Sequence, residues 1–93
     1  MAQPSSEPIA KTHATLPDNV ALHARPAGMF VREAARFDAT VTLCADGKRA
    51  NAKSILEVLA LGATGGTELG IAASGDDAVE AVEHLARLIA RLT

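Results

Sequence analysis

The sequence predicts a two-layer α+β domain with the element order β-α-β-β-α-β-α. Its 93 residues correspond to one small domain. Segments in which apolar residues alternate, as in strands, are separated by segments in which apolar residues recur at helical spacing. The dipeptide Asp46-Gly47 lies between two extended runs, which indicates a hairpin and a sheet that is at least partly antiparallel. Helices that cover one face of such a sheet complete the α+β architecture.

The first half of the chain supplies a strand, a helix and a hairpin. Residues 1–8 have the composition of a flexible N-terminal tail, and we assign the domain to residues 9–93. Residues 9–16 alternate as in a strand, and the turn residues of 17–19 follow. Ala24 to about Ala35 is expected to be helical, and residues 39–46 begin the hairpin. The apolar face of this helix consists of Ala27, Phe30, Val31 and Ala34.

The second half adds a short helix, a fourth strand and the clearest helix. The short helix spans Ser54 to about Leu61, and a glycine-rich stretch at 62–66 ends it. Residues 67–74 alternate as in a strand. A helix over 77–92 begins with a predicted capping box, with Asp77 as N-cap and Glu80 three residues later. The apolar stripe of this last helix consists of Val79, Val82, Leu85, Ala86, Ile89 and Leu92.

Composition narrows the functional classes. The single cysteine, Cys44, has no internal disulfide partner, which fits a reducing compartment. No apolar run approaches the roughly 20 residues that cross a bilayer, and the N-terminus does not resemble a secretory signal. We therefore expect a cytoplasmic protein that does not insert into membranes.

Charge is distributed unevenly. Residues 23–53 hold six basic and three acidic residues, whereas the rest of the chain holds three basic and eight acidic residues. A locally basic middle suits an anionic ligand or an acidic partner. Nucleic-acid binding is not expected, because the chain has only two aromatic residues and an acidic overall balance. The basic residues of this stretch are Arg25, Arg32, Arg36, Lys48, Arg49 and Lys53.

The segment ALHARPAG, residues 21–28, places His23 immediately before the predicted helix. The first N–H groups of a helix have no partner inside it and lie at the positive end of the helix dipole. An anion carried on the His23 ring can therefore fold back onto the N–H groups of Ala24 and Arg25. A free imidazole is largely neutral at pH 7 and can act as a nucleophile. The pattern thus indicates an anion site next to a nucleophile.

Two neighbours support this interpretation of His23. Arg25 offers a planar guanidinium that can bind phosphate oxygens, and Pro26 stiffens the first helical turn, where its missing N–H costs little. The helix end contributes about 0.3–1 kcal/mol, enough to tune a reversible transfer. On spacing alone, the alternative that His23 is only a polar residue at a helix start stays open.

The remaining polar residues do not suggest an enzyme or a metal site. We interpret His13, on the polar side of a strand, and His84, inside the last helix, as surface residues. No histidines, cysteines or carboxylates show a metal-ligand spacing, so no metal is expected. No acid–base pair or nucleophile elbow is apparent, which argues against an independent hydrolase.

Three segments together resemble HPr, the histidine-containing phosphocarrier family of the bacterial phosphoenolpyruvate:sugar phosphotransferase system. They are LHARPAGMFVREA, KRANAKSILEVLALGATGGTELGIAASG and AVEHLARLI, and the resemblance spans about residues 9–92. The resemblance implies an open-faced β-sandwich, with a four-stranded antiparallel sheet and three helices on one face. It also implies a phosphoryl carrier without a cofactor or metal of its own, and not an enzyme.

The resemblance assigns roles to particular residues. It implies that His23 accepts a phosphoryl group at Nδ1 from enzyme I, which is charged by phosphoenolpyruvate, and passes it to sugar-specific IIA domains. Arg25 is implied as the partner of that histidine. A monomer is expected, because the partners must reach the same face in turn. Two alternatives remain: a mainly regulatory HPr-like interaction module, and a phosphocarrier of the nitrogen branch with its own enzyme I.

Ser54 carries two interpretations. The residues predict an N-cap with Glu57 at the third helical position, which is a capping box. The resemblance implies a regulatory serine that an HPr kinase/phosphorylase modifies in some bacteria, with a transcription regulator as a further partner. Phosphorylation would add nearly two negative charges near the partner-binding face. Both roles are compatible.

Two local features are left open by the sequence. Ile55, Leu56 and Leu59 cannot all face inward on so short a helix, so some of them are expected to form an exposed apolar patch for partners. Met29 fits either the core or the rim of that patch. Ala21 stands where family members commonly have glycine, which would be strained if the position required a positive φ.

Overall fold

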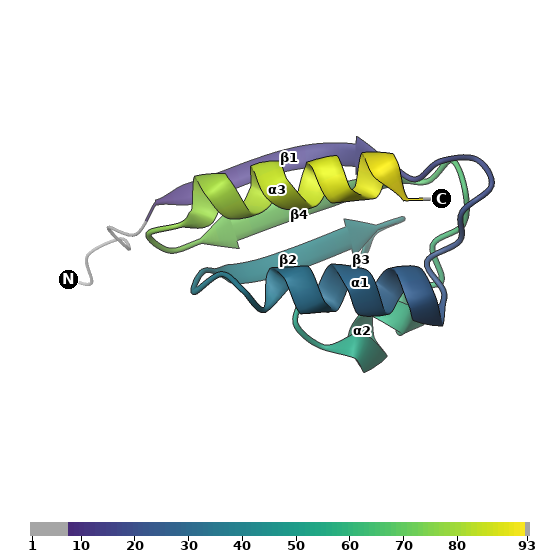
Figure 1. Ribbon diagram of the computed structural model, residues 1–93, viewed down its shortest axis with the longest axis horizontal. Coiled ribbons are helices and arrows are strands. Elements are labelled where there is room, and N and C mark those ends of the chain that lie inside the picture. Colours follow the sequence, from purple (N-terminus) through teal and green to yellow (C-terminus); the bar gives the residue numbers. More distant parts are fainter. Residues whose placement is uncertain (1–7, 93) are drawn as a thin grey trace.

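A computed structural model describes residues 8–92 and confirms the predicted element order (Figure 1). Residues 1–7, which make up most of the predicted tail, lie outside the described residues. Pro8 has no secondary structure, and its carbonyl accepts a hydrogen bond from the Gly75 N–H at 2.9 Å. The elements are β1 (Ile9–Thr15), α1 (Ala24–Ala34), β2 (Thr40–Ala45), β3 (Lys48–Asn51), α2 (Ile55–Ala60), β4 (Glu68–Ser74) and α3 (Ala78–Arg91).

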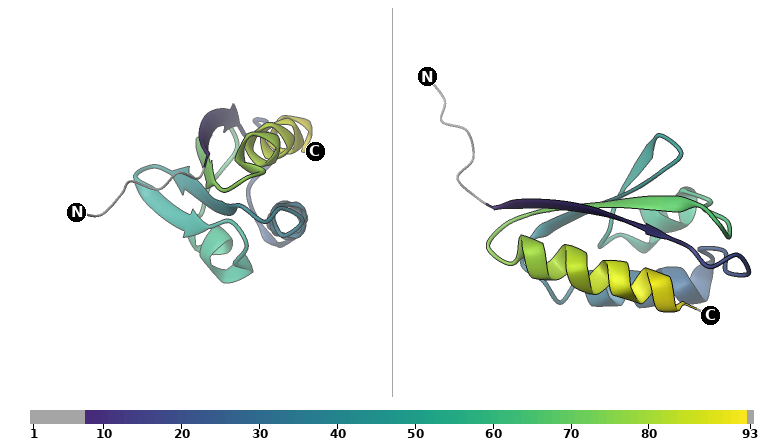
Figure 2. Two further views of the ribbon diagram at one scale, coloured as in Figure 1. Left: turned by 90° about the vertical axis from the view of Figure 1, so that its left-hand side faces the viewer. Right: turned by 90° about the horizontal axis from the view of Figure 1, so that it is seen from above.

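The four strands form one antiparallel sheet in the order β1-β4-β2-β3. Helices α1 and α3 lie side by side against one face of this sheet, and the opposite face carries no helix (Figure 2). The structure thus has the two layers that the sequence predicts, with an open face. No helix among residues 8–92 is long and apolar enough to cross a membrane.

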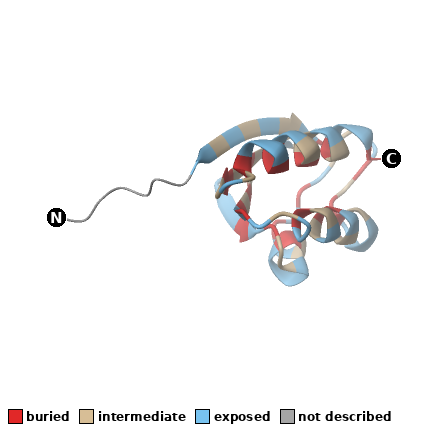
Figure 3. Ribbon diagram, turned by 60° about the vertical axis from the view of Figure 1, so that its left-hand side comes forward, coloured by how far each residue is buried: buried red, intermediate tan, exposed pale blue. Residues whose placement is uncertain are grey.

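The core lies between the sheet and the helices (Figure 3). Strand β4 shows the predicted alternation, with Leu69, Ile71 and Ala73 facing inward and buried. Burying a side chain the size of leucine or isoleucine contributes about 1.5–3 kcal/mol, so aliphatic residues can replace aromatic ones here. The expected apolar stripe of α3 is largely confirmed. The prediction that Val79 belongs to it is wrong, because Ala78 and Ala81 occupy the inward positions of the first turn and Val79 is 49% exposed.

The hairpin between β2 and β3 forms around Asp46 and Gly47 as predicted. Both residues have positive φ, 49° and 79°, which is the backbone conformation of a type I′ turn. This turn matches the twist of the flanking strands and fixes the register in which Ala45 pairs with Lys48. Strand β3 therefore becomes the short outer strand of the sheet.

The predicted capping box of α3 is wrong in its partners. Asp77 is the N-cap residue, but its side chain makes no capping hydrogen bond. Its carboxylate instead accepts the N–H of Asp38 at 2.9 Å and the N–H of Ala39 at 2.8 Å. These hydrogen bonds, the one from Asp38 foremost, hold the pKa of Asp77 below its usual value. Asp77 thus ties the start of α3 to the segment that leads into β2.

His84 is partly exposed, in line with its interpretation as a surface residue, but its ring also has partners. Its Nε2 lies 2.7 Å from Glu33 Oε1, and its ring centroid lies 5.6 Å from that of Phe37. Glu33 accepts a second hydrogen bond from Arg36 at 3.0 Å. The bond with His84 and then the contact with Arg36 lower the pKa of Glu33. His84 therefore links α3 to α1.

Replacing Asp77 by Asn tests the tie between α3 and β2. The pKa of Asp77 is depressed in the folded state, so its stabilising contribution is present above the unfolded value of about 3.9 and is lost as pH falls through the folded pKa. We expect Asp77→Asn to lower Tm at pH 7 and the difference from the unmodified protein to shrink steadily below about pH 4. Thermal unfolding followed by circular dichroism between pH 2 and 7 measures this.

The matched control is Asp76→Asn, which removes the same charge one residue earlier from an exposed side chain. It should leave Tm at pH 7 nearly unchanged. Equal losses of Tm in the two variants, or a deficit of Asp77→Asn that persists at pH 2, would contradict the proposed tie.

Candidate functional site

His23 is the N-cap residue of α1, with extended backbone (φ −86°, ψ −167°) and an exposed side chain. Its side chain makes no capping hydrogen bond to the helix. The imidazole is therefore not occupied in satisfying the helix end. Within the described part of the chain it is also not paired with an acid in an ion pair. The histidine is presented to solvent with its ring nitrogens available.

The helix start beside His23 offers two free donors. The N–H of Ala27 already donates to the His23 carbonyl at 2.8 Å, and Pro26 has no N–H. This leaves the N–H groups of Ala24 and Arg25, for which no acceptor is found among residues 8–92. Free N–H groups at a helix start, combined with the helix dipole, form an anion-binding site. The predicted juxtaposition of imidazole and anion site is present.

The backbone that carries His23 is fixed from both sides. Leu22 is 1% exposed, and its N–H donates to the Ala63 carbonyl at 2.9 Å. The His23 N–H donates to the Ala21 carbonyl at 2.8 Å. Further back, the N–H of Gly66 donates to the Leu16 carbonyl at 3.0 Å. The segment before α1 is thus attached to the loop before β4, and the His23 backbone cannot move independently of the core.

Ala21 is accommodated without strain. Among the described residues other than glycine, only Asp46 has a positive φ, so Ala21 lies in an ordinary backbone region. The position does not require glycine in this chain. The backbone strain that Ala21 would cause at a position of positive φ is therefore absent from the loop before His23.

Arg25 is exposed and makes no ion pair with another described residue. It lines a hollow of about 270 Å³ at the junction of α1 and α3, together with Arg91 from the end of α3. Sequence reasoning missed Arg91, because only the packing of α3 against α1 brings its C-terminal end to the start of α1. The remaining lining residues are Pro26, Met29, Leu88 and Leu92.

The basic middle of the chain does not converge on His23. Lys53 donates from Nζ to the Phe37 carbonyl at 2.7 Å, and Arg36 pairs with Glu33. Lys48 and Arg49 lie on the outer strand β3. Of the six basic residues, Arg25 is the one that adjoins His23 in the chain, so the anion site rests on it and on the helix start.

Ser54 is the N-cap of α2, as predicted, and its hydroxyl accepts the Glu57 N–H at 3.3 Å. The reciprocal half of the capping box is wrong: the Glu57 carboxylate accepts the Asn51 N–H at 2.9 Å and not that of Ser54. The Ser54 N–H donates instead to the Asn51 carbonyl at 3.0 Å. The cap role of the hydroxyl is confirmed.

The apolar residues of α2 divide as expected. Leu56 is 77% exposed and Ile55 is 38% exposed, whereas Leu59 packs partly buried against the core. Met29 on α1 is 36% exposed and so belongs to the surface. Helices α1 and α2 contact each other. Ile55, Leu56 and Met29 thus leave exposed apolar surface on α2 and α1. The binding of partners to this surface stays a prediction.

Fold and site together define a class: an open-faced β-sandwich with an exposed histidine at a helix start. The family model "PTS HPr component phosphorylation site" matches residues 10–91. The chain therefore belongs to the HPr family, whose members are phosphocarriers of the phosphotransferase system and not catalysts. Among residues 8–92, no group of three or more potential metal ligands comes together.

Individual relatives agree with this assignment. The phosphocarrier protein HPr of Vibrio cholerae is 49% identical over 71 residues, covering 76% of this chain and 84% of the relative. The HPr-like protein Crh of Bacillus subtilis is 48% identical over 68 residues, covering 73% and 80%. The crystal structure of HPr from Bacillus anthracis superimposes with a TM-score of 0.83 at 38% identity, over 87% of this chain and 96% of that one. The predicted fold is confirmed.

Gly65 tests the attachment of the His23 segment. A Cβ at this position would lie 2.0 Å from the Asp18 carbonyl oxygen, so the backbone of one of the two loops must move. We expect Gly65→Ala to destabilise the protein by about 1–3 kcal/mol, the usual cost of overpacking. Urea unfolding measures the change.

Gly28, inside α1, is the matched control, because a Cβ there meets nothing within 4 Å. Gly28→Ala should stabilise the protein by up to about 1 kcal/mol, the helix preference of alanine over glycine. A Gly65→Ala variant as stable as the unmodified protein would show that the two loops are not held in close contact.

Proposed function

We propose that His23 accepts a phosphoryl group from phosphorylated enzyme I and passes it to sugar-specific IIA domains. The supporting observation is the exposed His23 imidazole beside the free N–H groups of Ala24 and Arg25. A phosphoryl group bonded to this ring can reach those donors and the Arg25 guanidinium. No other described histidine has this setting, because His13 lies on a strand and His84 is engaged with Glu33.

The transfer needs little from the carrier itself. The lone pair of a deprotonated His23 nitrogen, Nδ1 by resemblance to the family, forms a bond to phosphorus. The donor's bond to phosphorus breaks at the same time, and the donor keeps that electron pair. Passing the group to a IIA domain reverses these roles. Positioning and charge stabilisation are the main contributions a protein makes to such a step.

The exposure of the site suits a relay. Both donor and acceptor must reach the same ring in turn, which an enclosed pocket would prevent. The helix end stabilises an adjacent anion by about 0.3–1 kcal/mol, so the phosphoryl group is held but not trapped. We also propose that the chain works as a cytoplasmic monomer, although one crystal structure of the relative Crh is described as a swapped dimer.

Incubation with phosphoenolpyruvate and enzyme I tests the proposed role of His23. The unmodified protein should gain one acid-labile phosphoryl group, measured by intact-mass spectrometry and by its loss in acid. His23→Ala should gain none. Arg25→Ala should be phosphorylated about 10–100-fold more slowly, because it loses charged hydrogen bonds worth about 1.5–3 kcal/mol.

Arg49→Ala serves as the control, since it removes an equal charge from the outer strand β3. It should keep nearly the full rate. Phosphorylation of His23→Ala, or equal slowing by the two arginine variants, would refute the assigned roles. Comparing rates with a sugar-branch and a nitrogen-branch enzyme I distinguishes the two branches.

We further propose that phosphorylation of Ser54 regulates this transfer through an HPr kinase/phosphorylase, and that the modified protein binds a transcription regulator. Two observations support it. The Ser54 hydroxyl lies at the start of α2, where a phosphate is electrostatically tolerated by the helix. The relative Crh is described as the catabolite repression HPr of Bacillus subtilis. The exposed Ile55 and Leu56, the proposed partner contacts, directly follow Ser54.

Substitution of Ser54 separates its two roles. Ser54→Ala should lose about 1 kcal/mol of stability with the cap and should keep the phosphorylation rate. Ser54→Asp keeps a capping carboxylate, so it should retain stability but accept the phosphoryl group from enzyme I more slowly. Urea unfolding measures the stability, and a time course of phosphorylation by enzyme I measures the rate. An unchanged rate in Ser54→Asp would argue against regulation at this site.

A further inference from the structure

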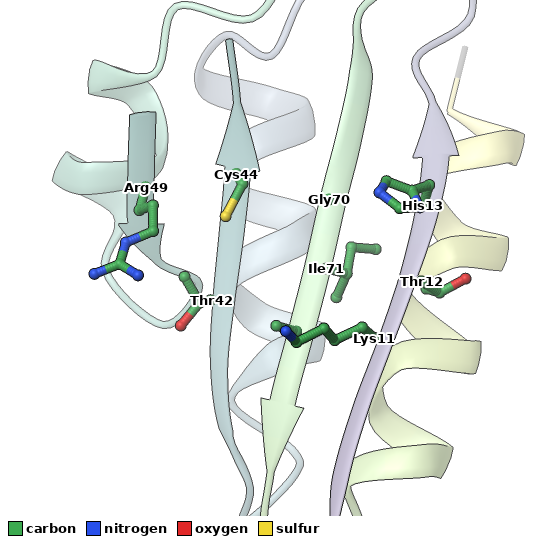
Figure 4. Close-up of a pocket in the computed structure, with 9 residues that line it drawn as sticks. Lys11, Thr12, His13, Thr42, Cys44, Arg49, Gly70 and Ile71 are labelled. Atoms are coloured by element: carbon green, nitrogen blue, oxygen red, sulfur yellow. The ribbon is translucent and has the colours of Figure 1, made fainter. Parts of the chain in front are cut away.

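The uncovered face of the sheet carries a hollow that the proposed phosphoryl transfer does not use (Figure 4). It lies on the side of the sheet away from α1 and α3, and its volume is about 360 Å³. This size falls in the range of sites for small molecules. Residues from all four strands line it: Lys11, Thr12, His13, Thr42, Cys44, Arg49, Gly70, Ile71 and Ala72.

Small residues of β4 form the floor of this hollow. His13, Gly70, Cys44 and Arg49 follow one another in register across β1, β4, β2 and β3. A Cβ on Gly70 would lie 3.5 Å from the Cys44 Cβ and 3.9 Å from the His13 Cδ2. His13 and Cys44 therefore flank the same space above Gly70. Ala72, two residues further along β4, continues this low floor.

The walls of the hollow are basic. Lys11 and His13 come from β1 and Arg49 from β3, and no acid lines the hollow. None of the three forms an ion pair with another residue in the described range 8–92. Glu68 lies on the same face one row beyond Gly70 but does not line the hollow. In Figure 4 the Arg49 guanidinium points away from β4, so the Lys11 ammonium is the positive charge at the floor, and it forms no ion pair with a residue in the range 8–92.

The Lys11 side chain is placed to bind a ligand that rests on the β4 residues of the hollow. In Figure 4 this side chain reaches from β1 across β4, and the His13 ring, on the same strand, points toward Gly70. Thr42, on the far side of β4, adds a hydroxyl. The Lys11 ammonium, which Figure 4 shows over β4, can donate charge-assisted hydrogen bonds to a phosphate, and such bonds are strong.

We propose that this hollow binds a small phosphorylated metabolite. Its phosphate pairs with the Lys11 ammonium over β4, and its uncharged body rests on Gly70 and Ala72, beside His13. Binding here is independent of phosphoryl transfer, because His23 begins a helix on the opposite face of the sheet. The site would let the carrier sense a phosphorylated product while its histidine stays free for partners.

Titration with glucose 6-phosphate, observed by ¹H–¹⁵N NMR, tests the proposal. The amides of His13, Gly70 and Cys44 should shift and saturate, and glucose at the same concentrations should leave them unmoved. Lys11→Gln should weaken the affinity at least fivefold. Lys48→Gln, which removes an equal charge at the hairpin outside the hollow, should not weaken it.

Several outcomes would overturn the proposal. Shifts confined to Ala24 and Arg25 would place the phosphate at the start of α1 alone. Linear, unsaturated shifts, or equal affinity in Lys11→Gln, would show general attraction to positive charge. Phosphorylation of Lys11→Gln by enzyme I is measured in parallel. It should proceed at the normal rate, so loss of metabolite binding and loss of the carrier function are told apart.

Discussion

The attachment of residues 16–22 to the loop at 63–67 is the constraint on which the functional site depends. Leu16, Val20 and Leu22 are all buried, and their segment shares backbone hydrogen bonds with Ala63, Gly66 and Thr67. These contacts determine where α1 begins and therefore which N–H groups remain free. Close packing leaves little room for adjustment, as the approach of Gly65 to the Asp18 carbonyl shows. The exposed His23 is thus supported by a rigid base.

The same arrangement explains why the site needs so few functional side chains. A buried leucine directly before the histidine fixes the backbone, and the ring beyond it faces solvent. The helix start supplies donors without any side chain, and Arg25 adds a permanent charge. A carrier needs a group that two partners can reach, and this geometry provides it. The uncovered face of the sheet is left free for a separate use.

Local signals in the sequence were sufficient for the elements and for much of the site. Alternation predicted the strands, Asp46-Gly47 the hairpin, and the residues around His23 the anion site. Val79 and the Glu57 carboxylate were misplaced locally, but the other contacts that the sequence did not show join residues that are distant in the chain. Asp77 resembles a helix cap, but its carboxylate binds N–H groups almost forty residues earlier, at Asp38 and Ala39. His84 resembles a surface residue until α3 packs against Glu33, and Arg91 approaches Arg25 for the same reason. The periodicity of apolar residues describes one helix or strand at a time, so it does not predict contacts between elements.

The proposed function requires that His23 carries the phosphoryl group against the start of α1. NMR of the protein phosphorylated by enzyme I and phosphoenolpyruvate tests it most directly. Phosphorus should be bonded to Nδ1 of His23, as seen in the ring ¹⁵N shifts, and the Ala24 and Arg25 amide protons should shift markedly downfield as they donate to the phosphate. Phosphorus on another histidine, or unmoved amides at Ala24 and Arg25, would contradict it.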